Sequence, residues 1–224
     1  MTQVPVSTRA PSGDGSAWCT LRLVDGHAER YPSLAEYLER LPLGIDSYPR
    51  HLVKSSLLRG LLAECPAGGD VTALPVTLRS VLSNPPPPSA WIPEVHFVAC
   101  HFAVVDMHQL DPEEMQQRTY RANRKLTESA MYRALATVSS PGVLLRVARM
   151  SWGLIHKGIT LHADVESNAA VLTLRHPPHL YTSVAHRSAA LGFIAVLEAS
   201  HGKNPHAEVV HSAVDHTQIR ASWE

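Results

Sequence analysis

Histidines are the residues of this chain whose type and spacing point most directly to chemistry. The sequence holds fourteen of them, and along one very apolar stretch Glu94, His101 and His108 recur every seven residues. On a helix this spacing forms one stripe, but seven residues make two turns, about 10.5 Å, too far for neighbouring ligands to share one metal ion at about 2.1 Å each. We therefore expect His101 to be a core histidine that is hydrogen-bonded to a neighbour.

Two further pairs stand four residues apart, which is one helical turn. His96 and Cys100 could together give two ligands to a metal or haem site, but we favour a coincidence of helical spacing. Trp152 and His156 could place an indole and an imidazole on the same wall of a cavity, or Trp152 could simply pack in the core. The spacing alone leaves both alternatives open for each pair.

Known catalytic motifs are missing from the sequence. It contains no G-x-S-x-G, H-E-x-x-H, Walker or dinucleotide-binding G-x-G-x-x-G pattern. A triad assembled in space from the many serines and histidines remains open. The sequence favours a non-enzymatic protein, and we assign no catalytic or metal-ligating residue.

Composition limits the class of protein. With 224 residues, 45% of them hydrophobic, the chain can bury one substantial core. Lys plus Arg (20) balance Asp plus Glu (20), so nucleic acid is not expected as a partner. No run of 18 apolar residues predicts a membrane span. Three widely separated cysteines without CxxC spacing indicate a reducing, cytoplasmic location.

Domain boundaries follow from the same patterns. Residues 1–16 are polar and rich in Gly, Ser and Pro, which predicts a disordered tail. Residues 17–224 are expected to form a single α+β domain, with a helical part over 33–157 and a sheet-forming part over 158–224. Residues 18–24 could add an edge strand.

The first two-thirds of the chain is predicted to be mostly helical. Helix-start residues, proline stops and apolar spacing define the helices, and Ser33 with Glu36 forms a capping-box pattern for the first of them. The predicted helices cover about 34–41, 49–64, 75–82, 93–108, 112–127, 131–138 and 141–157. The four prolines at 85–88 predict a stiff connector between packed helices.

After Gly158 the apolar period changes from about 3.6 to 2. The alternation predicts strands over 159–165, 169–175, 207–211 and 217–223, with a helix over 181–200 between the two pairs. The tail histidines are expected mostly at loops or at outward strand positions. The predicted fold is α+β, in which a mostly helical N-terminal two-thirds packs on a small antiparallel sheet formed by a C-terminal strand pair, helix and strand pair. This tail is expected to supply the only sheet.

This order of elements resembles the superfamily that includes haem-NO-binding domains, 4-vinyl-reductase-like domains and transport-particle subunits. Within it, the stretches Ser129-Ala130-Met131-Tyr132-Arg133 and Ser151-Trp152-Gly153 resemble an uncharacterised, mainly myxobacterial family. The resemblance covers about residues 30–223. It implies a closed pocket between helices and sheet that takes haem, a lipid tail or a small aromatic, with sensory or assembly roles.

One departure from that superfamily concerns haem. Its haem-binding members carry a Tyr-x-Ser-x-Arg signature for the haem propionates. This chain has Tyr181 and Ser183 but Ala185 where the arginine belongs, with Arg187 two places later. The resemblance therefore leaves the cofactor unknown, with haem as a candidate that the missing arginine argues against.

We expect a small-molecule-binding or protein-interaction module with a sensory, regulatory or assembly role. Its ligand site is predicted between the helices that start at Pro93 and Ser140 and the sheet. The predicted ligand-binding residues are Phe97, His101, Trp152 and His156. The expected partners are a hydrophobic small molecule and a second copy of the chain or another protein. One alternative is a haem- or metal-binding protein that uses His101 or His96. Another is a homodimer that meets at a sheet edge or at the Leu57/Leu58 helix.

Overall fold

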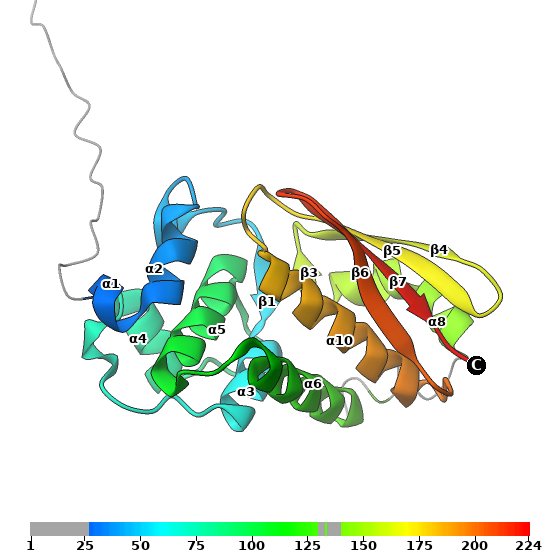
Figure 1. The fold of residues 1–224 in the computed structure, drawn as a ribbon, viewed down its shortest axis with the longest axis horizontal. Helices are drawn as coiled ribbons and strands as arrows, with labels where there is room; N and C mark the ends of the chain where they lie inside the picture. Colours follow the sequence, from blue (N-terminus) through cyan, green and yellow to red (C-terminus); the bar gives the residue numbers. More distant parts are fainter. Residues whose placement is uncertain (1–26, 130–132, 134–139) are drawn as a thin grey trace, which may run out of the picture.

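Helices and antiparallel sheets make up the protein, as the sequence predicts. The computed structural model describes residues 27–129, 133 and 140–224. Figure 1 shows a helical part beside a four-stranded sheet, with one long helix, α10, lying along the sheet. The predicted tail over 1–16, strand over 18–24 and helix over 131–138 lie outside the described residues, apart from Arg133.

Most predicted helices are present within a few residues of their expected bounds. The helical elements are α1 His27–Arg30, α2 Pro32–Glu39, η1 Gly44–Asp46, α3 Ser55–Glu64, η2 Val71–Ala73, α4 Val76–Ser83, α5 Glu94–His108, α6 Pro112–Glu128, α8 Pro141–Arg146, α9 Ala148–Gly153 and α10 Ser183–Ala199. None of the helices in the described part is both long and apolar enough to cross a membrane.

The C-terminal sheet confirms the change of period after Gly158. Its strands are β4 Thr160–Val165, β5 Ala169–Arg175, β6 His206–Ser212 and β7 His216–Ser222. They pair antiparallel in the order β4-β5-β7-β6, so that β5 and β7 join the two predicted pairs. Leu172 of β5 lies opposite Ile219 of β7, and both are fully buried on the face that packs against the helices.

A second, smaller sheet lies in the helical part, and the sequence did not predict it. Its strands are β1 Leu52–Lys54, β2 Trp91–Pro93 and β3 His156–Lys157, in the order β2-β1-β3. The expectation that the tail supplies the only sheet is therefore wrong, and the helix predicted over 49–64 starts only at Ser55. Val53 is fully buried between Ile92 and His156, because backbone pairing with distant strands overrides local helix propensity.

The predicted helix over 141–157 is also wrong in its second half. Helix α8 ends at Arg146, and α9 covers only Ala148–Gly153 before the chain enters β3. The pairing of His156 with Val53 draws this segment out of the helix. Because the chain leaves the helix at Gly153, His156 projects from a strand rather than from the helix that carries Trp152.

The structure confirms one of two predicted helix caps and contradicts the other. Asp111 caps α6 by accepting a hydrogen bond from the Glu114 backbone N–H at 2.8 Å, as its sequence pattern indicates. The Ser33 capping box of α2 does not form. Instead the Asp106 carboxylate, at the end of α5, accepts hydrogen bonds from the backbone N–H groups of Ser33 and Leu34 at 3.2 and 3.0 Å. This contact ties α2 to α5.

Candidate functional site

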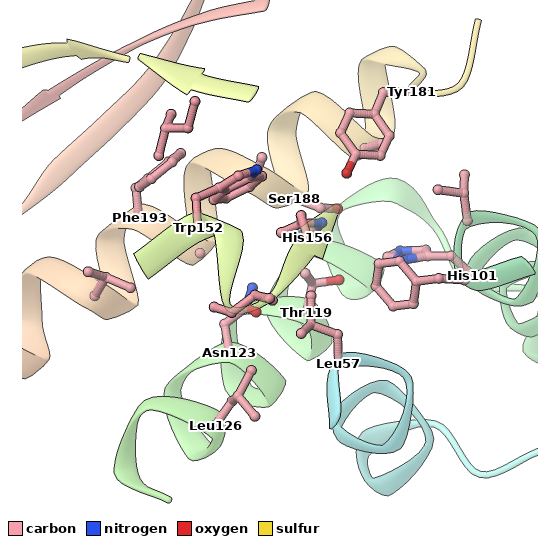
Figure 2. A pocket seen from close by; sticks show the side chains of 18 of the residues that line it. Leu57, His101, Thr119, Asn123, Leu126, Trp152, His156, Tyr181, Ser188 and Phe193 are labelled. Atoms are coloured by element: carbon pink, nitrogen blue, oxygen red, sulfur yellow. The ribbon is translucent and has the colours of Figure 1, made fainter. Parts of the chain in front are cut away.

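A cavity of about 230 Å³ lies where the helical part meets the C-terminal sheet (Figure 2). Helix α10 forms one wall, and its cavity-lining residues are Val184, Ala185, Ser188, Ala189, Gly192, Phe193 and Val196. Helix α5 contributes Phe97 and His101, α8 contributes Leu144 and Leu145, and β4 contributes Leu161. The cavity therefore lies between α5, α8 and the sheet, where the sequence predicts a ligand site. The contributions of α10 and α6 to the cavity wall were not predicted.

All four residues predicted to bind a ligand line this one cavity. Phe97 and His101 come from α5, with their rings edge to face and centroids 6.4 Å apart. Trp152 of α9 and His156 of β3 stack with centroids 4.1 Å apart. Phe193 of α10 lies against the other side of this group, with its ring centroid 6.2 Å from that of Trp152. An aromatic wall is thus assembled from four elements.

A buried carboxylate holds one of these rings. Glu94 is fully buried, and its Oε2 lies 3.1 Å from Nδ1 of His156. Tyr181 donates its hydroxyl to Oε1 of the same carboxylate at 2.7 Å. Glu94 is the first residue of α5, where the positive end of the helix dipole favours a negative charge. Since Nδ1 of His156 is engaged, Nε2 is the ring nitrogen left for other contacts.

Tyr181 keeps its proton in this cluster. Burial raises the pKa of its hydroxyl well above the ordinary value, and the negative charge of Glu94 raises it further. A protonated hydroxyl can donate, which is what the contact with Glu94 requires. In the sequence Glu94 stands out only by its spacing from His101 and His108, and no local signal pairs it with His156 and Tyr181, 62 and 87 positions away.

His101 differs from its expected role. It is nearly buried, as predicted, but within the described part of the chain its Nε2 has no hydrogen-bond partner. Burial lowers the pKa of its imidazole to about 4, so the ring is neutral near pH 7. The prediction that a neighbour satisfies His101 is therefore wrong for this nitrogen.

Two more buried polar atoms at the cavity lack a partner. Oγ1 of Thr119, on α6, and Nε1 of Trp152 make no hydrogen bond among the described residues. Asn123 of α6 and Ser188 of α10 add an amide and a hydroxyl to the same wall. Figure 2 shows Thr119 and Asn123 on α6 and His101 entering from α5. The cavity is thus mostly apolar, with scattered hydrogen-bonding groups.

Charged side chains are missing from this wall. Of the described residues that line the cavity, none is Asp, Glu, Lys or Arg. Ala185, which stands where haem-binding members have an arginine, lines the cavity. Arg187 is exposed and does not line it.

The second predicted pair, His96 and Cys100, lies elsewhere. Neither residue lines the cavity, and Cys100 is fully buried in the helical core, where burial raises its thiol pKa to about 12. His96 is half-buried, and desolvation lowers its pKa. In the described ranges, no group of three or more His, Cys, Asp or Glu residues is placed to hold a metal ion.

Two tail histidines are buried, against the general expectation for that segment. Nε2 of His186 on α10 lies 3.0 Å from Nε2 of His176, and Nδ1 of His186 lies 2.7 Å from the Ser212 hydroxyl. His176 also packs against the Tyr181 ring, with centroids 4.9 Å apart. This network packs against the ring of the same tyrosine that donates to Glu94.

Comparison with known proteins shows which fold surrounds this cavity. No protein-family model matches the chain, and no curated protein sequence matches it significantly. Solved structures of haem-NO-binding (H-NOX) domains do match in fold. A Tt H-NOX carrying two substitutions is 13% identical, with a TM-score of 0.53, and the match covers 76% of this chain and 95% of that one.

Two other solved structures give the same result. A Cs H-NOX variant that contains 4-cyano-L-phenylalanine is 11% identical with a TM-score of 0.50, over 76% of this chain and 96% of that one. A structure described as modulating haem redox potential through porphyrin distortion is 10% identical with a TM-score of 0.52, over 76% and 99%. At these identities the likeness is one of fold, and it supports the superfamily resemblance at that level.

Proposed function

We propose that this protein is a small-molecule-binding module with a sensory, regulatory or assembly role and no catalytic function of its own. The observation that carries the proposal is the mostly apolar cavity between α5, α6, α10 and the sheet. Protein interiors are usually close-packed, with few voids larger than a water molecule. The walls of this space of about 230 Å³ are aromatic with scattered polar groups, a lining that is typical of a ligand site.

Haem is the second candidate, and one observation favours it. Nε2 of His101 is unpaired at the cavity, and a histidine is a common axial ligand of haem iron. The remaining residues do not fit the group. The two carboxylates of haem would meet no cationic side chain among the described residues of the wall, and Ala185 stands where an arginine would be needed.

The size of the cavity also argues against haem. Its volume of about 230 Å³ is below the roughly 300–1,000 Å³ of pockets for drug-sized ligands. We therefore propose a ligand smaller than haem. Titration of the purified protein with haemin should give no new Soret band, and a Soret band that is lost in His101→Ala would favour haem instead.

Two finer expectations, a homodimer and a family assignment, remain proposals. A homodimer is one of them, but its interface is not at the Leu57/Leu58 pair, because Leu58 is fully buried and Leu57 lines the cavity. A sheet edge, such as β6, is the surface that is left for it. Membership of the myxobacterial family is the other, and its Ser129–Arg133 motif lies partly outside the described residues.

Indane, a two-ring hydrocarbon, is a suitable probe for the binding function. Saturation-transfer NMR should detect its binding to the unmodified protein, and native mass spectrometry should reveal any copurified molecule. Ala189→Phe should abolish the indane signal because it places a ring in the cavity. Arg187→Phe puts the same side chain on the exposed side of α10 and should leave the signal intact. No indane signal with any of the three proteins, or equal signals from all of them, would contradict the proposal.

A further inference from the structure

The charge that a ligand can carry follows from the wall of the cavity. No Asp, Glu, Lys or Arg is among the described residues that line it. Both carboxylate oxygens of Glu94 already have partners, in His156 and Tyr181. Burial lowers the pKa of His101 to about 4, which leaves that ring neutral. A charged ligand would lose its hydration here without an opposite charge to replace it.

Part of the hydrogen-bonding capacity of the wall is left unused by the described residues. His101 Nε2, Thr119 Oγ1 and Trp152 Nε1 are buried polar atoms without a partner in the described part of the chain, and they come from three different helices. Buried polar groups are nearly always paired, and leaving one unpaired destabilises the folded state. These three atoms are enclosed by neighbouring atoms, so a ligand in the cavity would bond instead to the polar side chains of Asn123 and Ser188, which also line it.

The volume of the cavity limits the size of this ligand. An apolar cavity of about 150 Å³ holds one benzene molecule. At about 230 Å³ the present cavity is half as large again, which matches a ring system of about nine heavy atoms on the same scale. The stacked Trp152 and His156 rings and the nearby Phe193 favour a flat ligand.

We propose that the ligand is an uncharged, flat molecule of one or two rings with a single hydrogen-bonding group, held between the Trp152 wall and the polar side chains of α6 and α10. This inference rests on the proposed binding function and specifies its ligand class. Carboxylates, phosphates and ammonium compounds of the same size are excluded by it.

Three probes with one ring skeleton test the inference by isothermal titration of the full chain. Indane has no polar group, 5-indanol adds an uncharged hydroxyl, and indane-5-carboxylate adds a negative charge. We expect 5-indanol to bind about tenfold more tightly than indane, since one net hydrogen bond is worth about that factor. The carboxylate should not bind measurably.

The possible outcomes separate the two proposals. If none of the three probes binds, the binding function itself fails, and the ligand class fails with it. If indane binds as tightly as 5-indanol, or the carboxylate binds most tightly, the cavity is a binding site but the ligand class is wrong.

Two substitutions locate the hydrogen bond. Asn123→Leu removes the amide group from the α6 side of the cavity, and Ser188→Ala removes the hydroxyl from the α10 side. Either or both should weaken 5-indanol binding several-fold more than they weaken indane binding. Equal losses for the two probes, or no loss in either variant, would show that these polar atoms do not select the ligand.

Discussion

The imidazole of His156 lies on the indole of Trp152, with ring centroids 4.1 Å apart and planes inclined by 14°. On its other side, Nδ1 of His156 contacts the buried carboxylate of Glu94 at 3.1 Å. Stacking holds the plane of the ring, and the carboxylate selects the nitrogen that carries the proton. His156 is therefore held in one orientation at the edge of the cavity.

Replacing Glu94 by glutamine should move the ring proton of His156. The amide oxygen can still accept from Tyr181, but the amide NH₂ would then donate to Nδ1 of His156. We expect the imidazole to shift from the Nδ1–H to the Nε2–H tautomer, which ¹⁵N NMR of labelled histidine detects. The free energy of unfolding should fall by about 1 kcal/mol, because charge-assisted hydrogen bonds become neutral ones.

Glu198→Gln is the matched control for this change. Glu198 also accepts a hydrogen bond from a tyrosine, Tyr120, but lies away from the cavity wall. It should leave the His156 resonances unaltered. An unchanged tautomer in Glu94→Gln would mean that the carboxylate does not set the protonation of this ring.

Part of this site could be predicted from the sequence, although the structural reasoning behind the prediction was only partly correct. Trp152 and His156 do share a cavity wall, but their spacing suggested one helix, whereas they come from α9 and β3. Glu94 and Tyr181 were missed because their contact joins residues 87 positions apart. The C-terminal strands were predictable because a period of two follows from burial of one face of a sheet.

The small sheet of β1, β2 and β3 shows why other parts of the fold could not be predicted from the sequence. Each strand has only two or three residues, too few for alternation to be visible. Val53 is buried by pairing with Ile92 and His156, and neither partner is near it in sequence. Such short strands exist because of tertiary contacts rather than local propensity.

Gly158 is required where the chain passes from β3 to β4. Its φ is +82°, and a Cβ added there would lie 2.7 Å from Cδ2 of His51. Gly158→Ala should therefore combine backbone strain of about 1–2 kcal/mol with a steric clash, and lower the free energy of unfolding in urea by more than the strain alone.

Gly69→Ala separates the two contributions. Gly69 has a φ of +77°, but a Cβ there would meet no heavy atom within 4 Å. In this variant the free energy of unfolding should fall only by the backbone strain, about 1–2 kcal/mol. Equal losses in the two alanine variants would show that the His51 ring moves aside at no cost.

Acid should destabilise the protein through its buried histidines. Burial lowers the pKa of His101 and of His186 to about 4, from an ordinary value of 6.5. Between those values the unfolded chain takes up protons that the folded chain does not, so stability is highest above pH 6.5 and falls as pH drops toward 4. His101, which is nearly buried, alone accounts for a loss of about 3 kcal/mol over that window.

His101→Leu should reduce the loss of stability between pH 7 and 4 by the amount that His101 contributes. Urea denaturation at several pH values in this range measures the loss. The same substitution at His162, whose side chain is exposed on β4, should leave the profile as it is. A profile in His101→Leu as steep as in the unmodified protein would mean that His101 protonates readily in the folded state.

Thr119 and Thr217 offer one substitution in two environments. Both side chains are buried, but the Thr217 hydroxyl donates to the His211 carbonyl at 2.7 Å, whereas Thr119 Oγ1 has no partner in the described part of the chain. Thr217→Val should destabilise the ligand-free protein by about 1–3 kcal/mol, because the carbonyl loses its donor. Thr119→Val should be neutral or stabilising, since an unsatisfied hydroxyl is replaced by a methyl of the same shape. Thermal unfolding of the two variants compares them directly, and a loss in Thr119→Val as large as that in Thr217→Val would show that the Thr119 hydroxyl is hydrogen-bonded in solution.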